Sequence, residues 1–197
     1  MTQKTLKNKK AGKVIIFSAP SGSGKTTIVR HLLKQNYSFG FSISATSRSP
    51  RATEENGKDY YFLSTEDFKK KIDNDEFLEW QEVYSGTFYG TLKSEVERIR
   101  NEGENVLLDI DVLGGINVKK IYGNESLSVF IKAPSLEELK TRLKLRSTDS
   151  DEVIGKRIDK AEYELSFAPK FDIILINDKL EDAFIESEKI VEKFLNK

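Results

Sequence analysis

Apolar residues form short, separated runs along the chain, and four of these runs have the length and composition of buried strands. They cover residues 13–18, 105–111, 127–131 and 171–176 and are rich in valine, isoleucine and leucine. A short apolar run bounded by polar residues is typical of a parallel strand that is buried on both faces. We therefore expect these four segments to pair in one sheet.

Between and beyond these runs, the apolar positions follow a helical period. Helices are expected at 26–34, around residues 136 and 154, and near the C-terminus. The period is carried by Leu136, Leu139 and Leu143 in one segment and by Ile154, Ile158, Ala161 and Leu165 in the next. Strands that alternate with helices of this length predict an α/β fold, with a parallel sheet flanked by helices.

Two segments interrupt the alternation. Residues 44–91 are rich in Ser, Thr, Tyr, Phe and Gly and predict a mixed β insertion, whereas 144–168 is charged and predicts a helical lid. The lysine-rich segment 1–12 is expected to be disordered or frayed. No internal repeat or low-complexity linker is found, so we expect a single domain over 13–197, whose core comprises 13–43 and 92–197.

Composition removes several classes of function. The chain of 197 residues has 32 Lys and Arg against 32 Asp and Glu, which argues against bulk electrostatic binding to nucleic acid or anionic membranes. It has no cysteine and one histidine, His31, which excludes disulfides, a thiolate nucleophile and Cys/His zinc sites. The apolar runs are too short for a membrane span or a signal-peptide core. We expect a cytoplasmic protein.

A loop of small residues follows the first expected strand and precedes an expected helix. From Ala19 to Thr26 it matches the phosphate-binding pattern G-x-x-x-x-G-K-[S/T], except that alanine occupies the first position. Backbone N–H groups of such a loop form an anion site that the positive end of the helix completes, and its glycines permit positive φ. Lys25 is expected along the β- and γ-phosphates of a nucleotide, and Thr26 as a ligand of Mg²⁺. The expected ATP-binding residues of the loop are Ser21, Gly22, Ser23, Gly24, Lys25, Thr26 and Thr27.

The insertion carries residues suited to a second phosphate. Arg48 and Arg51 flank a Ser-Pro pair and Tyr60 follows, a combination that could clamp a phosphate monoester or form an ordinary basic surface turn. Glu79 lies between Leu78 and Trp80, where burial of a carboxylate requires polar partners.

Asp109 and Asp111 are two residues apart in an expected strand, so we expect their side chains on the same side. One interpretation is that carboxylates at the end of this strand hold a magnesium-bound water near the phosphate loop. For Asp111, an alternative is a helix cap, because Gly114 and Gly115 follow.

Taken together, these motifs resemble those of guanylate kinases, in the P-loop nucleoside monophosphate kinase family. They are S-x-P-S-G-x-G-K-T, S-x-T-x-R-x-P-R, N-G-x-D-Y-x-F, F-L-E-W, Y-G-T and L-D-I-D, in family order from about Lys13 to the last helix. The resemblance implies a P-loop kinase core with a GMP-binding insertion and a lid. It also implies Mg²⁺-dependent phosphorylation of GMP, and of dGMP, by ATP.

The resemblance also assigns residues. It implies that Asn177 lies near the adenine of ATP and that Glu79 carries base specificity. The GMP set is Ser44, Arg48, Arg51, Tyr60, Glu79, Tyr89, Thr91 and Asp111. The catalytic set is Lys25, Arg48 and the lid arginines Arg142, Arg146 and Arg157, and the metal set is Thr26 with Asp109 through water.

Two other functions stay open at this point. One is a non-catalytic protein-interaction module of the same fold, in which a degraded phosphate loop and attached domains would be expected. The other is a related P-loop kinase that acts on a sugar phosphate, against which Glu79, Ser44 and the tyrosines argue. The expected partner is a small nucleotide, with no nucleic acid or membrane, and the chain is expected to be a monomer or homodimer.

Overall fold

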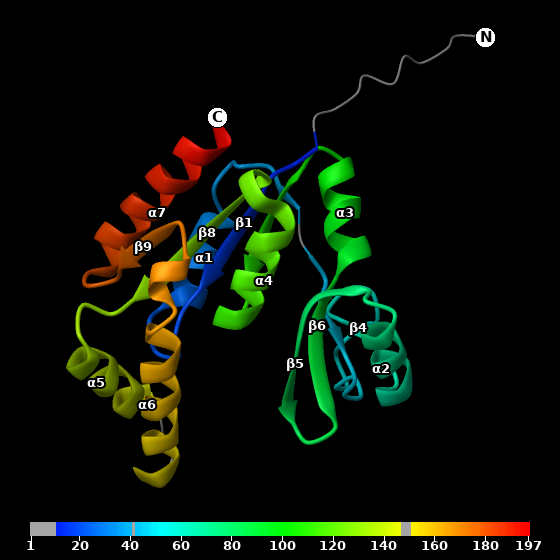
Figure 1. The fold of residues 1–197 in the computed structure, drawn as a ribbon, viewed down its shortest axis with the longest axis horizontal. Helices are drawn as coiled ribbons and strands as arrows, with labels where there is room; N and C mark the ends of the chain where they lie inside the picture. The colour runs from blue at the N-terminus through cyan, green and yellow to red at the C-terminus, as the bar shows by residue number, and fades with distance from the viewer. Residues whose placement is uncertain (1–10, 41, 147–150) are drawn as a thin grey trace. The chain divides into compact units, whose positions relative to one another are not determined.

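A computed structural model describes residues 11–40, 42–146 and 151–197, in two compact units (Figure 1). The core unit comprises Val14–Tyr37 and Leu107–Lys197. The insertion unit comprises Ser38–Val106 with the segment that ends at Lys13. Its bounds are wider than the expected insertion at 44–91. Within the described residues, no helix is long and apolar enough to cross a membrane.

Parallel strands form the centre of the core unit. They are β1 (Val14–Ser18), β7 (Asn105–Asp109, of which Leu107 to Asp109 belong to this unit), β8 (Ser126–Lys132) and β9 (Ile173–Ile176), in the order β7-β1-β8-β9. Val14 pairs with Ser126 and Val129 pairs with Ile173, both in parallel register. All five residues of β1 are buried, as expected for an apolar strand between two others.

Helices flank this sheet, which confirms the predicted α/β class. They are α1 (Lys25–Leu32), α4 (Val112–Tyr122), α5 (Leu136–Arg146), α6 (Asp151–Leu165) and α7 (Leu180–Leu195). Short 3₁₀ turns occur at Gly123–Glu125 and Ala168–Lys170. α4 packs on β1 and β8, α5 packs on α6, and α7 packs on α1 and β9. His31 of α1 stacks on Phe184 of α7, a structural role.

Two expected strands are shorter than their apolar runs. The run at 171–176 begins with residues that close a 3₁₀ turn, so β9 starts at Ile173. The expected strand at 105–111 ends at Asp109, and Asp111 is the N-cap of α4. The prediction that Asp109 and Asp111 lie on the same side of a strand is therefore wrong.

The insertion unit contains a mixed four-stranded sheet, as its composition predicted. Its strands are β3 (Ala45–Thr46), β4 (Tyr61–Phe62), β5 (Phe77–Tyr84) and β6 (Thr87–Leu92), in the order β4-β3-β6-β5. β4 runs parallel to β3, and the other pairings are antiparallel. A further short strand, β2 (Phe39–Gly40), pairs in parallel with Asn105 and Val106 at the start of β7.

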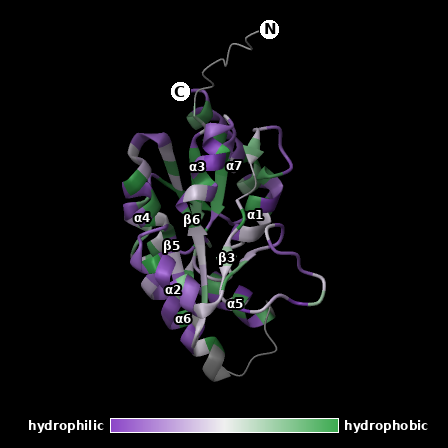
Figure 2. Ribbon diagram, turned by 90° about the vertical axis from the view of Figure 1, so that its right-hand side faces the viewer, coloured by the Kyte–Doolittle hydropathy of each residue, from purple (hydrophilic) through white to green (hydrophobic). Residues whose placement is uncertain are grey.

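This unit has its own apolar cluster. It comprises Ala45, Phe68, Phe77, Phe88 and Leu92, and Phe68 stacks on Phe77 with ring centroids 4.3 Å apart. Phe68 is the one fully buried residue of α2 (Thr65–Asp73), whose other residues are mostly hydrophilic (Figure 2). The helix α3 (Lys93–Asn101) completes the unit.

The expectation for the N-terminus falls mainly on residues 1–10, outside the described residues. Gly12 is described and exchanges hydrogen bonds with Arg100 of α3. Its N–H donates to the Arg100 carbonyl at 2.9 Å, and Arg100 Nε donates back to the Gly12 carbonyl at 2.8 Å. Gly12 is therefore held to α3 by two hydrogen bonds.

Candidate active site

The phosphate loop connects β1 to α1 with the backbone that its glycines predicted. Gly22 and Gly24 have φ of +87° and +89°, in the left-handed region that side chains with a Cβ disfavour. Gly24 has a second constraint, because a Cβ there would lie 2.2 Å from Nδ2 of Asn177. A tight turn at the start of a helix is the backbone arrangement in which anion sites form.

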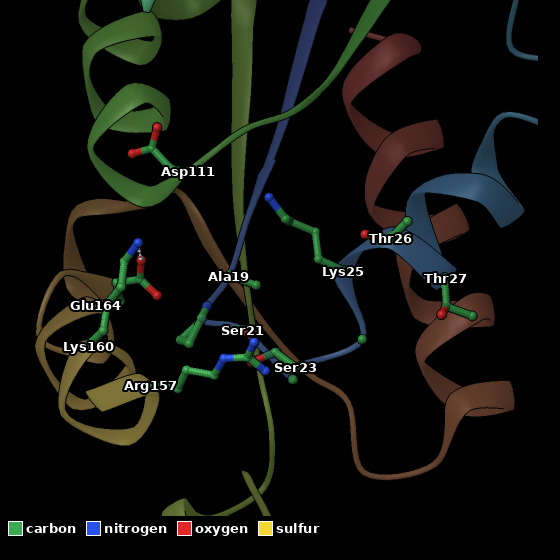
Figure 3. A pocket seen from close by; sticks show the side chains of 13 residues that line it. Ala19, Ser21, Ser23, Lys25, Thr26, Thr27, Asp111, Arg157, Lys160 and Glu164 are labelled. Carbon is green, nitrogen blue, oxygen red and sulfur yellow. Dashed lines mark ion pairs between the residues drawn. The ribbon is translucent and has the colours of Figure 1, made fainter. Parts of the chain in front are cut away.

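A cavity of about 340 Å³ opens on this loop (Figure 3). It is lined by the predicted loop residues from Ser21 to Thr27 and by Arg157 of α6. Asp111, Lys160 and Glu164 also line it. The structure therefore brings the phosphate loop and one predicted lid arginine to the same cavity.

Lys25 is held at the carboxyl end of β7. Its Nζ lies 2.6 Å from Oδ1 of Asp109 and donates to the carbonyl of Ile110 at 2.7 Å. The side chain of Lys25 is 18% exposed and that of Asp109 31% exposed. Asp109 therefore lies beside the phosphate loop, where its predicted role near the metal requires it. Its Oδ1 atom forms an ion pair with Lys25.

Asp111 caps a helix beside the same cavity. Its Oδ1 accepts hydrogen bonds from the N–H groups of Leu113 at 2.9 Å and Gly114 at 3.0 Å. These bonds satisfy two N–H groups that α4 would otherwise leave without an acceptor. Of the two interpretations of Asp111, the helix cap is present in the structure.

Lys160 and Glu164 are cavity residues that the sequence analysis did not single out. They lie three and seven residues after Arg157, on one face of α6. Figure 3 shows both on the turns of α6 that face the loop, with Lys160 Nζ 3.8 Å from Glu164 Oε1. Burial raises the pKa of Glu164, and the nearby Asp111 carboxylate raises it further, while Lys160 and Lys25 lower it. Their spacing from Arg157, at i+3 and i+7, is the sequence pattern that could have identified them as residues on the same helix face.

Asn177 lies behind the loop, where it fixes the backbone. It is 4% exposed, and its Nδ2 donates to the carbonyl of Ser23 at 2.9 Å. Arg142 of α5 donates in turn to the carbonyl of Asn177 at 2.9 Å and to Glu138 at 2.8 Å. Arg142 therefore holds the segment after β9 in place and is not among the residues that line the cavity. The side chain of Arg146, the third predicted lid arginine, lies outside the described part of the structure.

In the insertion unit, Arg48 is the centre of a polar and aromatic cluster. Its Nε donates to the Tyr89 hydroxyl at 3.1 Å, and the guanidinium carbon lies 5.1 Å from the centre of the Tyr60 ring. The rings of Tyr60 and Tyr89 are 6.0 Å apart, edge to face. Three of the residues predicted to bind the GMP phosphate are thus in contact.

Glu54, which the sequence analysis did not assign, holds this arginine. The two amino groups of the Arg48 guanidinium donate to the two carboxylate oxygens of Glu54, at 2.6 and 2.7 Å. Glu54 also accepts from the backbone N–H of Arg51 at 2.8 Å. The Arg48 hydrogen bonds, with the Arg51 N–H, lower the pKa of Glu54 to about 2. One carboxylate therefore links the two arginines of the predicted clamp, while the Arg51 side chain is exposed.

Glu79 is hydrogen-bonded to Thr91, another residue that was predicted to bind GMP. The hydroxyl of Thr91 donates to Oε1 of Glu79 at 2.6 Å, where the two residues face each other across β5 and β6. Glu79 is half-buried, between the buried Leu78 and the exposed Trp80. Ser44 lies just before β3, where its carbonyl accepts from the N–H of Tyr61 at 2.9 Å.

Comparison with known proteins identifies relatives along almost the whole chain. The sequence model of the guanylate kinase family matches residues 11–194. A guanylate kinase of Bacteroides thetaiotaomicron is 56% identical over 94% of this chain and 91% of that protein. One of Porphyromonas gingivalis is 50% identical over 94% of this chain and 99% of its own length.

The fold also matches a solved structure. The crystal structure of a guanylate kinase from Anaplasma phagocytophilum aligns with a TM-score of 0.69 at 28% identity, and covers 96% of this chain and 89% of that one. Sequence and fold therefore give the same family, as the motifs predicted.

Proposed function

The chain belongs to the guanylate kinase family and is an enzyme that phosphorylates GMP to GDP with ATP as donor, and from this premise we propose how its residues divide the work. The donor would bind at the phosphate loop of the core unit. The acceptor would bind at the Arg48 and Glu79 clusters of the insertion unit. dGMP, which keeps the guanine and the phosphate, is proposed as a second acceptor.

The donor site supplies positive charge to the phosphates. Lys25 and the N–H groups at the start of α1 would bind the β- and γ-phosphates, and Arg157 would neutralise charge that develops during transfer. The cavity of about 340 Å³ is at the lower end of the range of small-molecule sites. Asn177 would act by holding the Ser23 carbonyl, and thus the shape of the loop.

Mg²⁺ fits the oxygen donors present at this site. Thr26 is exposed at the loop. The Asp109 carboxylate, 31% exposed, lies at the end of β7 in an ion pair with Lys25. No group of three or more His, Cys, Asp or Glu that could hold a metal occurs among the described residues. This agrees with an ion that takes few protein ligands and completes its shell with phosphate oxygens and water. When bound, Mg²⁺ would neutralise negative charge on the phosphates. Thr26 would hold the ion directly, and Asp109 would hold it through a water molecule.

The arrangement of the acceptor residues on β6 carries the proposal. Tyr89, which contacts Arg48, and Thr91, which contacts Glu79, are two residues apart and thus point to the same face of the strand. Their Cα atoms are about 7 Å apart at the usual rise of a strand. A phosphate clamp and a carboxylate on one face at this spacing suit the two ends of one mononucleotide.

Glu79 would select guanine. A carboxylate can accept hydrogen bonds from the N1–H and N2–H₂ groups of guanine, whereas adenine presents an acceptor and a C–H at that edge. No general base is needed, because the acceptor phosphate is mostly dianionic at neutral pH with a second pKa near ~6. Transfer then depends on alignment and on charge neutralisation.

The direct test measures ADP release from Mg-ATP with GMP, dGMP, AMP, UMP and CMP supplied separately. Turnover restricted to GMP and dGMP is expected. Glu79→Ala is expected to lower kcat/KM for GMP by at least ~10-fold, since each lost hydrogen bond to a charged group is worth about 1.5–3 kcal/mol. An unchanged kcat/KM for GMP in this variant, with AMP still rejected, would contradict a role in base selection.

A further inference from the structure

The core unit ends in a strand whose outer edge is open and apolar. Among the residues that the structure describes, β9 is the last strand of this sheet and pairs with β8 alone. Its four residues are Ile173, Ile174, Leu175 and Ile176, with no charge, proline or glycine among them. Native proteins usually protect such an edge with charged residues, proline or a bulge. β9 has none of these within its length.

Exposed isoleucines surround this edge. Ile174 is 42% exposed, and Ile176 and Ile185 are each 53% exposed. A groove of about 590 Å³ runs between β9 and α7, lined by the whole strand and by one face of the helix from Asp182 to Ile190. In Figure 1, β9 lies beside α7.

The backbone of β9 offers free hydrogen-bonding groups at defined residues. The N–H of Asn177, just after the strand, donates to the carbonyl of Lys132 in β8 at 2.8 Å. Because alternate residues of a strand face opposite neighbours, Leu175 and Ile173 also pair toward β8, and Ile174 and Ile176 point their N–H and C=O groups outward. The outward groups therefore belong to the two exposed isoleucines of the strand.

We propose that β9 pairs in antiparallel orientation with β9 of a second copy of this chain, in a symmetric dimer whose two-fold axis passes at Leu175. Ile174 would then lie opposite Ile176 of the partner subunit, and each such pair exchanges two backbone hydrogen bonds. The same patch serves both copies, as a two-fold interface requires.

Charge favours a second copy over an unrelated partner. The groove face of α7 has Asp182 at one end, Glu186 in the middle and Lys189 at the other end. Antiparallel α7 helices on the same face of the joined sheet bring the basic end of one helix to the acidic end of the other. The chain also has zero net charge, so long-range repulsion between copies is absent.

Cysteine cross-linking tests the pairing residue by residue, because the chain has no cysteine of its own. Ile174→Cys and Ile176→Cys are made as separate proteins, mixed, oxidised and run on a non-reducing gel. In the proposed register these two positions are about 5.5 Å apart between Cα atoms, within disulfide range, whereas two copies of either position are diagonal neighbours about 7–8 Å apart. A covalent dimer is expected in the mixture and much less in either protein alone.

Sedimentation of the unmodified chain provides the second measurement. A dimer is expected, and Ile176→Lys is expected to convert it to a monomer without loss of the folded circular dichroism spectrum. The matched control is Ile121→Lys, on α4, since Ile121 is also 53% exposed but lies outside the groove. A monomer at all concentrations of the unmodified chain, equal cross-linking in mixed and single samples, or dissociation by the Ile121 variant would overturn the proposal.

Discussion

At the scale of single residues, the least expected feature is that a carboxylate holds the arginine assigned to the GMP phosphate. Glu54 forms a two-point fork with Arg48 and accepts from the N–H of Arg51. A planar fork of this kind fixes the orientation of a guanidinium as well as its position. The Nε of Arg48 is not used by the fork and donates a hydrogen bond to the Tyr89 hydroxyl. Glu54 is therefore expected to act as a positioning residue.

Glu54→Gln is expected to raise KM for GMP by about 10-fold while kcat changes less, because the neutral amide no longer orients the Arg48 guanidinium by a charge-assisted fork and Arg48 is a binding group. Glu55→Gln is the matched control, because the adjacent Glu55 is exposed and forms an ion pair with Lys58 in the same loop. Steady-state kinetics with GMP varied measures the effect. A lower KM in Glu54→Gln would show that Glu54 competes with the phosphate.

The same residue predicts a pH dependence of stability. Because the Arg48 hydrogen bonds hold the pKa of Glu54 at about 2, below its ordinary value of 4.5, the ionised carboxylate stabilises the fold above that ordinary value. This contribution is lost as pH falls from about 4.5 toward about 2. Urea unfolding is expected to show the unmodified chain more stable than Glu54→Gln at neutral pH, with the difference shrinking through this window. A difference that does not change with pH would contradict the assignment.

At the scale of elements, Asp111 shows how one side chain determines where a strand ends and a helix begins. β7 stops at Asp109, and the Asp111 carboxylate accepts from Leu113 and Gly114 at the start of α4. Loss of such a cap costs about 0.5–2 kcal/mol, whereas asparagine caps as well as aspartate. The family resemblance assigns the same residue to guanine.

Two variants of Asp111 separate these roles. Asp111→Ala is expected to lower the free energy of unfolding by about 1 kcal/mol, and Asp111→Asn to leave it nearly unchanged. If the carboxylate also binds guanine, Asp111→Asn loses kcat/KM for GMP at unchanged stability. Thermal unfolding and kinetics on the same two proteins measure both properties. Equal destabilisation by both variants would contradict the cap as the main structural role.

The sequence predicted elements better than contacts, for a physical reason. Apolar runs and helical periods record which parts of an element are buried, so the strands and the helices around Leu139 and Ile158 could be predicted to within a few residues. The phosphate loop could be predicted from its motif. The fork between Arg48 and Glu54 lies in irregular backbone, where no period fixes side-chain direction. Lys160 and Glu164 enter the cavity only through the packing of α6 on α5, which is a tertiary property.

At the scale of the whole molecule, the proposed donor and acceptor residues belong to different compact units. Lys25 is part of the core unit and Glu79 of the insertion unit, and each unit has its own buried apolar cluster. The core unit could be predicted from alternation alone. The insertion expected from composition covers 44–91, whereas the compact unit also includes β2 and α3.

Because the two sets of residues belong to different units, we expect that a substitution can weaken the binding of one nucleotide without weakening the binding of the other. Lys25→Ala is expected to weaken ATP binding by roughly 10-fold or more, as the loss of a charge-assisted contact implies, and to bind GMP as the unmodified chain does. Glu79→Ala is expected to show the reverse pattern. Isothermal titration of each variant with each nucleotide alone measures the four affinities, and thermal unfolding confirms that both proteins are folded. A large loss of GMP affinity in Lys25→Ala at unchanged thermal stability would mean that the two sites are coupled in the free enzyme, because a contact confined to one unit would then affect binding at the other.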